Sequence, residues 1–144
     1  MLQKMRVLLL VCITAVLAAC GGGDGGSDAT PNFAGTYQIS TINLTSNTCG
    51  GSPTGSIAGG FDTVVQNDRN VSMSGGAVTG TVDADNGGFT VSSTQVINGV
   101  TIVTSIKFRV TAAGASTFAV QVNSAGSAGS ASCAIGYTGT AVKS

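Results

Sequence analysis

The sequence contains no histidine, no tryptophan and no glutamate among its 144 residues. Without histidine, neither a Ser-His-Asp nor a Cys-His catalytic arrangement can be assembled, and without glutamate the commonest carboxylate for acid–base catalysis is missing. The usual tetrahedral zinc site is excluded as well, because Cys49 and Cys133 are the only cysteines after residue 20. The sequence therefore predicts a protein that is not an enzyme and that holds no cofactor.

Good helix formers are also scarce, since Leu44 is the only leucine after residue 20 and charged residues make up 8% of the chain. Valine, isoleucine, threonine and phenylalanine recur instead, in short alternating runs that turn residues separate. We expect residues 32–144 to form one all-β domain, an antiparallel up-and-down meander of about eight strands. A closed barrel is favoured over a sandwich, because closure removes exposed strand edges.

Several strands can be placed individually. Val100 to Ala112 alternates apolar residues with polar ones, which predicts one buried and one wet face. Asn98-Gly99 precedes it and is typical of a type I′ hairpin turn. In the first strand, Ala34 to Leu44, the apolar residues change parity between Ser40 and Thr41, which predicts a bulge or bend. Residues 124–130, rich in serine, alanine and glycine, are expected to be a loop before the last strand.

The first 19 residues have the layout of a secretory signal. Lys4 and Arg6 give a positive start, Val7 to Leu17 is apolar except at Thr14, and small residues follow. The apolar run is about half of the roughly 20 residues that a membrane-spanning helix needs. A cleaved signal peptide over residues 1–19 is therefore expected.

The end of this segment, Leu17-Ala18-Ala19-Cys20, resembles the lipobox of bacterial lipoproteins. The resemblance implies that Cys20 carries a diacylglycerol and an amine-linked acyl group such as palmitate, which anchor the protein to a membrane. In this family an aspartate after the cysteine tends to retain the protein in the inner membrane, so Gly21 favours the outer membrane of the cell envelope. The alternative is an ordinary signal peptide with an incidental cysteine.

Residues 20–31 contain the lipidated cysteine and a glycine-rich linker with two aspartates. A flexible coil of this kind spans roughly 18 Å, so it would hold the domain near the membrane without fixing its orientation. Without residues 1–19 the chain has four basic and six acidic side chains, a formal charge of −2. This charge gives no basic stripe for nucleic acid, and we expect none to bind.

Cys49 and Cys133 lie near the two ends of the predicted domain. In an oxidising compartment we expect them to form a disulfide, which the chain-entropy model credits with about 4–5 kcal/mol for a loop of this length. A reactive thiol and metal ligation are the alternatives.

The charged residues suggest two weaker sites. Asp83 and Asp85 superficially resemble a calcium loop, but that motif would require an oxygen ligand at Gly87 and a glutamate at Thr94. They are better explained as flanks of a solvated hairpin. Lys107 and Arg109 are the only close basic pair after residue 20; they either contact an anionic headgroup or glycan, or simply keep a strand face wet.

The run Phe33-Ala34-Gly35-Thr36-Tyr37 resembles the opening of lipocalin-like (calycin) barrels, with Tyr37 where that family usually has tryptophan. The resemblance implies a barrel that encloses a small apolar ligand, and Tyr37, Tyr137 and Phe108 are candidates to line it. Two functions follow. One is a lipid-anchored envelope protein that binds a small apolar ligand or an envelope protein; the other is a structural or surface-coat lipoprotein with a packed core and no ligand.

Overall fold

The computed structural model describes residues 29–144, which contain ten strands and a single 3₁₀ turn, η1. The predicted signal peptide, Cys20 and most of the glycine-rich linker lie outside these residues. The elements are β1 (Gly35–Ile39), β2 (Ile42–Asn47), β3 (Ser56–Ile57), β4 (Gly60–Asn67), β5 (Asn70–Met73), η1 (Ser74–Gly76), β6 (Val78–Val82), β7 (Gly88–Ile97), β8 (Val100–Val110), β9 (Thr117–Ala128) and β10 (Ala131–Lys143).

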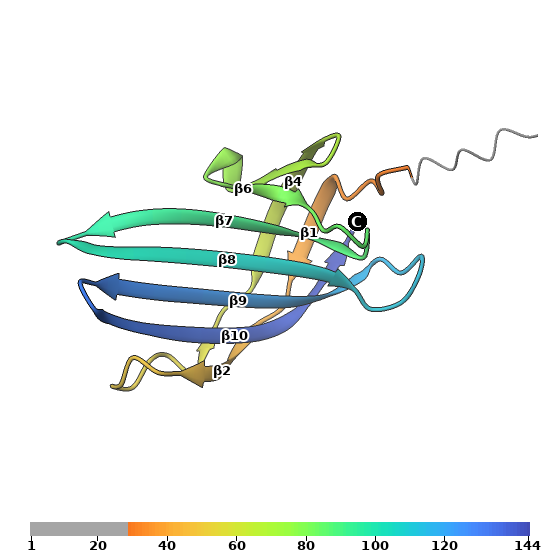
Figure 1. The fold of residues 1–144 in the computed structure, drawn as a ribbon. Coiled ribbons are helices and arrows are strands. Elements are labelled where there is room, and N and C mark those ends of the chain that lie inside the picture. The colour runs from red at the N-terminus through yellow and green to blue at the C-terminus, as the bar shows by residue number, and fades with distance from the viewer. Residues whose placement is uncertain (1–28) are drawn as a thin grey trace, which may run out of the picture.

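The strands form a closed antiparallel barrel (Figure 1). Its ring runs β1-β4-β5-β6-β7-β8-β9-β10 and returns to β1, because Tyr37 of β1 pairs with Lys143 of β10. β2 and β3 continue the sheet beside β10, where Leu44 pairs with Tyr137. The all-β class, the antiparallel meander and the preference for a barrel over a sandwich are therefore confirmed.

The expected break in the first strand separates β1 from β2 at Ser40 and Thr41. Tyr37 before the break and Ile42 after it are both buried, although they have opposite parity. The Ser40 amide donates to the carbonyl of Thr140 across the break. The pairing with β10 shifts by one residue between Ile39–Ala141 and Asn43–Thr138, as it does at a bulge. The bend lets one strand serve the barrel ring with β1 and the neighbouring sheet with β2.

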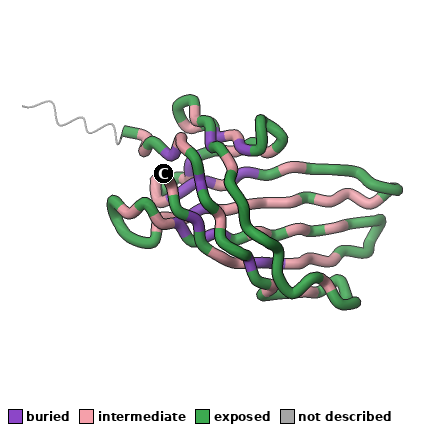
Figure 2. The backbone as a smooth tube through the Cα atoms, turned by 180° about the vertical axis from the view of Figure 1, so that it is seen from behind, coloured by how far each residue is buried: buried purple, intermediate pink, exposed green. Residues whose placement is uncertain are grey.

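Five aromatic side chains fill the inside of the barrel. Phe89 and Phe108 stack with ring centroids 4.7 Å apart, and the Tyr37 ring meets both edge-on at 5.9 and 5.5 Å. Phe33 and Phe118 complete the cluster, and all five are 0–5% exposed. Figure 2 shows the buried residues gathered at one end of the sheet, inside the ring. The interior is thus a packed core of side chains.

Four strands continue beyond this ring. β6 pairs with β7 only as far as Ser92, whereas β7 and β8 remain paired out to Ile97 and Val100. β9 and β10 are paired out to Ala128 and Ala131. We call the projecting part, residues 93–104 and 124–135, the extension; in Figure 1 it is the long four-stranded portion that reaches away from the C-terminus.

The extension corrects one prediction. Residues 124–130 are not a loop, because β9 runs to Ala128 and only Gly129 and Ser130 make the turn. Serine, alanine and glycine have low strand propensity, but here β8 holds them on one side and β10 on the other. Tertiary pairing outweighs local preference in this segment.

Candidate functional site

The candidate ligand residues do not line an open site. Tyr37 and Phe108 are 0% exposed at the centre of the aromatic cluster. The Tyr37 hydroxyl donates a 2.8 Å hydrogen bond to the carbonyl of Phe33, and burial raises the pKa of this phenol well above its ordinary value. Tyr137 lies outside the cluster and donates to the carbonyl of Thr54 at 3.2 Å. These side chains hold the barrel and its β2–β3 loop together.

The two acidic and the two basic residues singled out from the sequence come together at one end of the barrel. Arg109 Nη1 lies 2.7 Å from Asp85 Oδ2 and 3.4 Å from Asp83 Oδ2, and Lys107 Nζ lies 3.5 Å from Asp83 Oδ2. The hydrogen bond from Arg109 lowers the pKa of Asp85, and the same contact raises that of Arg109. The carboxylates and the cations thus serve as partners for one another.

Sequence reasoning missed this ion-pair cluster, although one signal was available. The two-residue turn Asn98-Gly99 fixes the register of its hairpin, which places Arg109 across from Gly88. Since Asp85 lies three positions before Gly88, the register alone would have brought Asp85 close to Arg109. The two faces predicted from alternation are found where β8 belongs to the barrel, since Phe108 is buried and the side chains of Lys107 and Arg109 are 40% exposed. In the extension the predicted buried face is only half-buried at Val100 and Ile102, and the strand ends at Val110 rather than at Ala112.

Arg69, which the sequence did not single out, closes the same end of the barrel. Its guanidinium donates to the carbonyls of Val82 and Asp83 at 3.0 and 2.7 Å, and to Asn86 Oδ1 at 3.0 Å. These acceptors belong to the turn between β6 and β7. Arg69 therefore holds that turn and is committed to a structural role.

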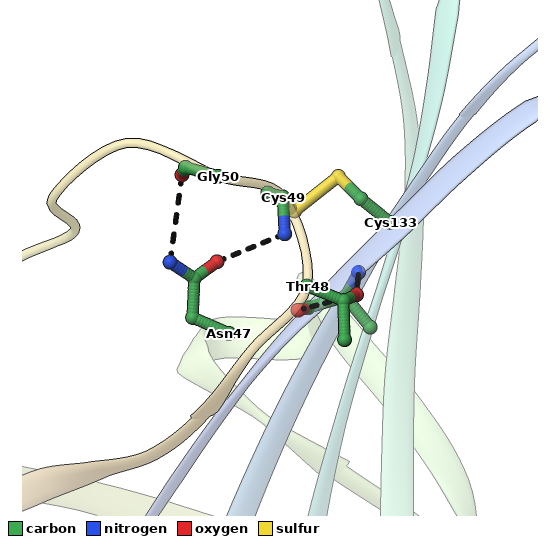
Figure 3. The surroundings of a disulfide bond; sticks show 6 residues. Asn47, Thr48, Cys49, Gly50 and Cys133 are labelled. Carbon is green, nitrogen blue, oxygen red and sulfur yellow. Dashed lines mark hydrogen bonds between the residues drawn. A yellow bond between two sulfur atoms is a disulfide. The ribbon is translucent and has the colours of Figure 1, made fainter.

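The predicted disulfide joins Cys49 to Cys133, with Cα atoms 4.6 Å apart and a sequence separation of 84 (Figure 3). Asn47 shapes the loop by accepting from the Cys49 amide at 2.9 Å. Thr48 acts as a further strand residue, since its amide donates to the carbonyl of Ala134 at 2.9 Å and its hydroxyl accepts from the Ala134 amide at 2.8 Å. The β10 edge of the extension is thereby covered and covalently fastened.

The extension carries no charged side chain at all, whereas the barrel ring and its turns carry eight, four of each sign, within residues 29–144. On the inner face, which continues the core side of the sheet, Ile97 is 50% exposed; on the outer face Val96 and Val103 are 69% and 41% exposed. A hollow of about 210 Å³ lies near the tip, lined by Val100, Gly126, Ser127, Ala128, Ala131, Ser132 and Cys133. The extension is therefore an uncharged, partly apolar surface.

Two other hollows lie on the barrel itself. One, of about 540 Å³, lies at the charged end beside Phe33, Phe118 and Lys143. Its polar groups are engaged internally: Lys143 Nζ donates to the carbonyl of Asn32 at 2.9 Å, and Asn86 accepts from Arg69. The other, of about 330 Å³, lies outside the ring around Val65 and Gly80. Val65 lines this hollow and is 59% exposed. Phe61, two pleats away on the same face of β4, is 74% exposed.

Residues 29–144 contain no cluster of three or more side chains suited to hold a metal ion. In the same part of the chain, no helix has the length and apolar character needed to cross a bilayer. Comparison of the chain with protein-family models, with curated proteins and with solved structures finds no significant match.

Proposed function

We propose that this protein is a lipid-anchored envelope protein whose barrel is a non-catalytic scaffold, and that it binds an envelope protein through the uncharged extension. The anchor is Cys20, as the lipobox-like sequence implies. The extension is the surface that meets the partner, and the charged end of the barrel is where the chain enters from the membrane.

One observation carries this proposal: the separation of charge between the two ends of the molecule. Charged side chains keep a surface solvated and discourage non-specific contacts, so a surface that lacks them while exposing Val96, Ile97 and Val103 is suited to a partner. Charge is also depleted at the centre of protein interfaces generally. A partner that matches this surface presents an uncharged face with small apolar side chains.

The packed interior supports a protein partner over an enclosed apolar ligand. Small-molecule sites have volumes of roughly 300–1,000 Å³ and enclose most of the ligand, whereas here five aromatic rings occupy the barrel interior. The hollow of about 210 Å³ at the tip of the extension falls below that range and suits one side chain of a partner. The two larger hollows, of about 540 and 330 Å³, have the volume but are open at the surface of the barrel and would not enclose a ligand. A coat protein without any partner would not need an uncharged projection.

The anchor is tested by replacing Cys20 with alanine in the full chain, expressed in its own host. We expect the wild-type protein in the membrane fraction and Cys20→Ala in the soluble fraction, with the Cys49–Cys133 disulfide intact in both. If Cys20→Ala remained in the membrane fraction, the anchor would have to be elsewhere.

The binding surface is tested with a photo-reactive amino acid placed in turn at Ile97 of the extension and at Thr111, an exposed residue of the opposite end. A defined protein adduct is expected from position 97 and none from position 111, and Cys20→Ala should abolish it. Native mass spectrometry of the purified full chain is the complementary measurement. A small molecule retained in stoichiometric amount, with no adduct at position 97, would overturn the proposal in favour of ligand binding.

A further inference from the structure

The extension has two edge strands, β10 and β7, and only the edge at β10 is covered by other described residues of the chain. At the β10 edge, Thr48 bonds to Ala134 and the disulfide fastens Cys49 to Cys133. At the β7 edge, no described strand other than β8 pairs with β7 beyond Ser92. Strand edges left open invite pairing with another chain.

The backbone groups at the open edge can be assigned from the ladder. The Asp83 amide donates to the carbonyl of Gly88, and the Val110 amide donates to the carbonyl of Gly87. Groups along an antiparallel strand alternate between its two neighbours, so even-numbered residues of β7 face the β6 side and odd-numbered ones face β8. Past the end of β6, the amides and carbonyls of Thr94 and Val96 therefore point away from the sheet.

None of the usual protective devices is present at this edge. Natural sheets blunt their edges with lysine, proline, a bulge or a covering loop. The segment Ser93-Thr94-Gln95-Val96-Ile97 has no charged residue and no proline, and its pairing with β8 is regular from Ile97 back to Gly88. Residues 94–97 are all exposed, with Val96 at 69% and Ile97 at 50%.

We propose that the open β7 edge pairs antiparallel with the same edge of a second copy of this chain, about a two-fold axis that passes beside Gln95. This inference rests on the proposed function: it names the partner of the extension, and it relies on the Cys20 anchor to concentrate the copies at one surface.

The segment is complementary to itself in that arrangement. With Gln95 of one copy opposite Gln95 of the other, Thr94 of each copy faces Val96 of its mate, and their outward amides and carbonyls form mutual hydrogen bonds. On the outer face, Val96 packs against the methyl group of the opposing Thr94. On the inner face the two Gln95 side chains meet, and their amide groups bond to each other. No like charges approach, since the extension has none.

The size of the contact indicates when it forms. Stable interfaces bury about 1,200–2,000 Å² in total, and one short edge buries much less. We therefore expect the contact to be weak in dilute solution. It becomes populated where many copies are held at one membrane surface, because anchoring raises their effective concentration. The test belongs in the intact, membrane-associated protein.

The register makes a sharp test available. In an antiparallel pair, residues that face each other without exchanging hydrogen bonds have Cα atoms about 4.5 Å apart, within the range that a disulfide can bridge. Gln95→Cys in the full chain, expressed in the host envelope, should give a covalent species of twice the mass under non-reducing conditions. Val103→Cys is the control: it is exposed on β8, and three strand spacings, about 14 Å, separate it from its mate.

A second substitution separates backbone pairing from mere proximity. On the Gln95→Cys background, Thr94→Pro removes the outward amide without breaking a bond to β8, as proline is tolerated at such edge positions; the cross-linked dimer should fall at least tenfold. Thr94→Val keeps the amide and should retain the dimer. If thermal unfolding shows that Thr94→Pro does not fold, Val96→Lys, which places a charge on the edge, serves the same purpose.

Absence of the Gln95→Cys dimer, an equal dimer from Val103→Cys, or a cross-link from position 95 to a different polypeptide would each overturn self-pairing. If self-pairing failed in one of these ways but the photo-reactive residue at position 97 formed an adduct with another protein, the proposed function would still hold. No adduct at position 97 would remove the proposed function itself.

Discussion

At the scale of single residues, the polar groups that looked chemically suggestive are all engaged by the fold. Asp83 binds Lys107 and Arg109, Asp85 binds Arg109, and Arg69 holds backbone carbonyls. Residues 29–144 contain no buried side-chain nitrogen or oxygen without a partner. Unpartnered buried polar groups often mark sites of chemistry. Since the described residues contain none, the function is better sought on the surface of the domain.

Arg69→Ala should destabilise the domain by about 1–3 kcal/mol, because the Val82 and Asp83 carbonyls lose their donor in a half-buried turn. Denaturant unfolding measures the change in free energy. Lys143→Ala is the matched control, since Lys143 makes a single exposed hydrogen bond to Asn32, and it should cost less than about 0.5 kcal/mol. Equal losses for the two variants would show that Arg69 does not hold the turn.

Replacing both Cys49 and Cys133 with serine should lower the free energy of unfolding by about 2–5 kcal/mol. The loop that the bond closes is long, so the unfolded chain regains much freedom when the bond is removed. A reductant provides the control: it should lower the stability of the wild-type protein by a similar amount and leave the double variant unchanged. A wild-type protein insensitive to reductant would contradict this prediction.

At the scale of strands, the sequence was informative wherever the signal was local. The turn Asn98-Gly99 and the parity change at Ser40 were predicted because a few adjacent residues determine them, and φ values of +51° and +78° at Asn98 and Gly99 confirm the turn. The far half of β9 was missed because its strand state depends on neighbours on both sides. The open edge of β7 depends on where β6 ends in space, which no local pattern encodes.

The close approach of β6 and β7 also depends on Gly80, a glycine of β6 that pairs with Val91. A side chain at Gly80 would collide with the carbonyl oxygen of Thr90 on β7. Gly80→Ala should therefore cost about 1–3 kcal/mol, as overpacking does. Gly126→Ala is the matched control in a strand, because its nearest contact is an ordinary 3.7 Å to Val100 Cγ1, and its stability should be unchanged or slightly higher.

Thermal or denaturant unfolding of the two glycine variants gives the comparison directly. A Gly80→Ala protein as stable as Gly126→Ala would mean that β6 and β7 can separate without loss, and close packing would not explain the glycine at position 80.

At the scale of the whole molecule, the two ends have different composition and different surroundings. The C-terminus and the first described residues lie at the charged end, where Lys143 bonds to Asn32, and the extension reaches away from them (Figure 1). A chain that enters at the charged end from a membrane anchor leaves the uncharged extension free to meet a partner. In the proposed function, the anchored chain enters the barrel at its charged end and the partner meets the extension at the opposite end.

The barrel itself is closed by its first and last strands, so its stability should depend on the final residues of the chain. Ile39 pairs with Ala141, which is 1% exposed, and the Ser40 amide donates to Thr140. Deleting residues 140–144 removes this seam, opens β1 to solvent and uncovers the aromatic core. We expect the truncated chain to lose its cooperative urea transition and to bind an apolar fluorescent dye.

Deleting Ser144 alone is the control, because it leaves every β1–β10 pair in place and should keep a cooperative transition. The disulfide does not substitute for the seam, since it fastens β10 at Cys133 on the extension, away from β1. We therefore expect that closure by β10 makes the curved sheet unfold as one cooperative unit. A sharp urea transition in the longer truncation, with β1 amides still protected from hydrogen exchange, would show that an open sheet is sufficient.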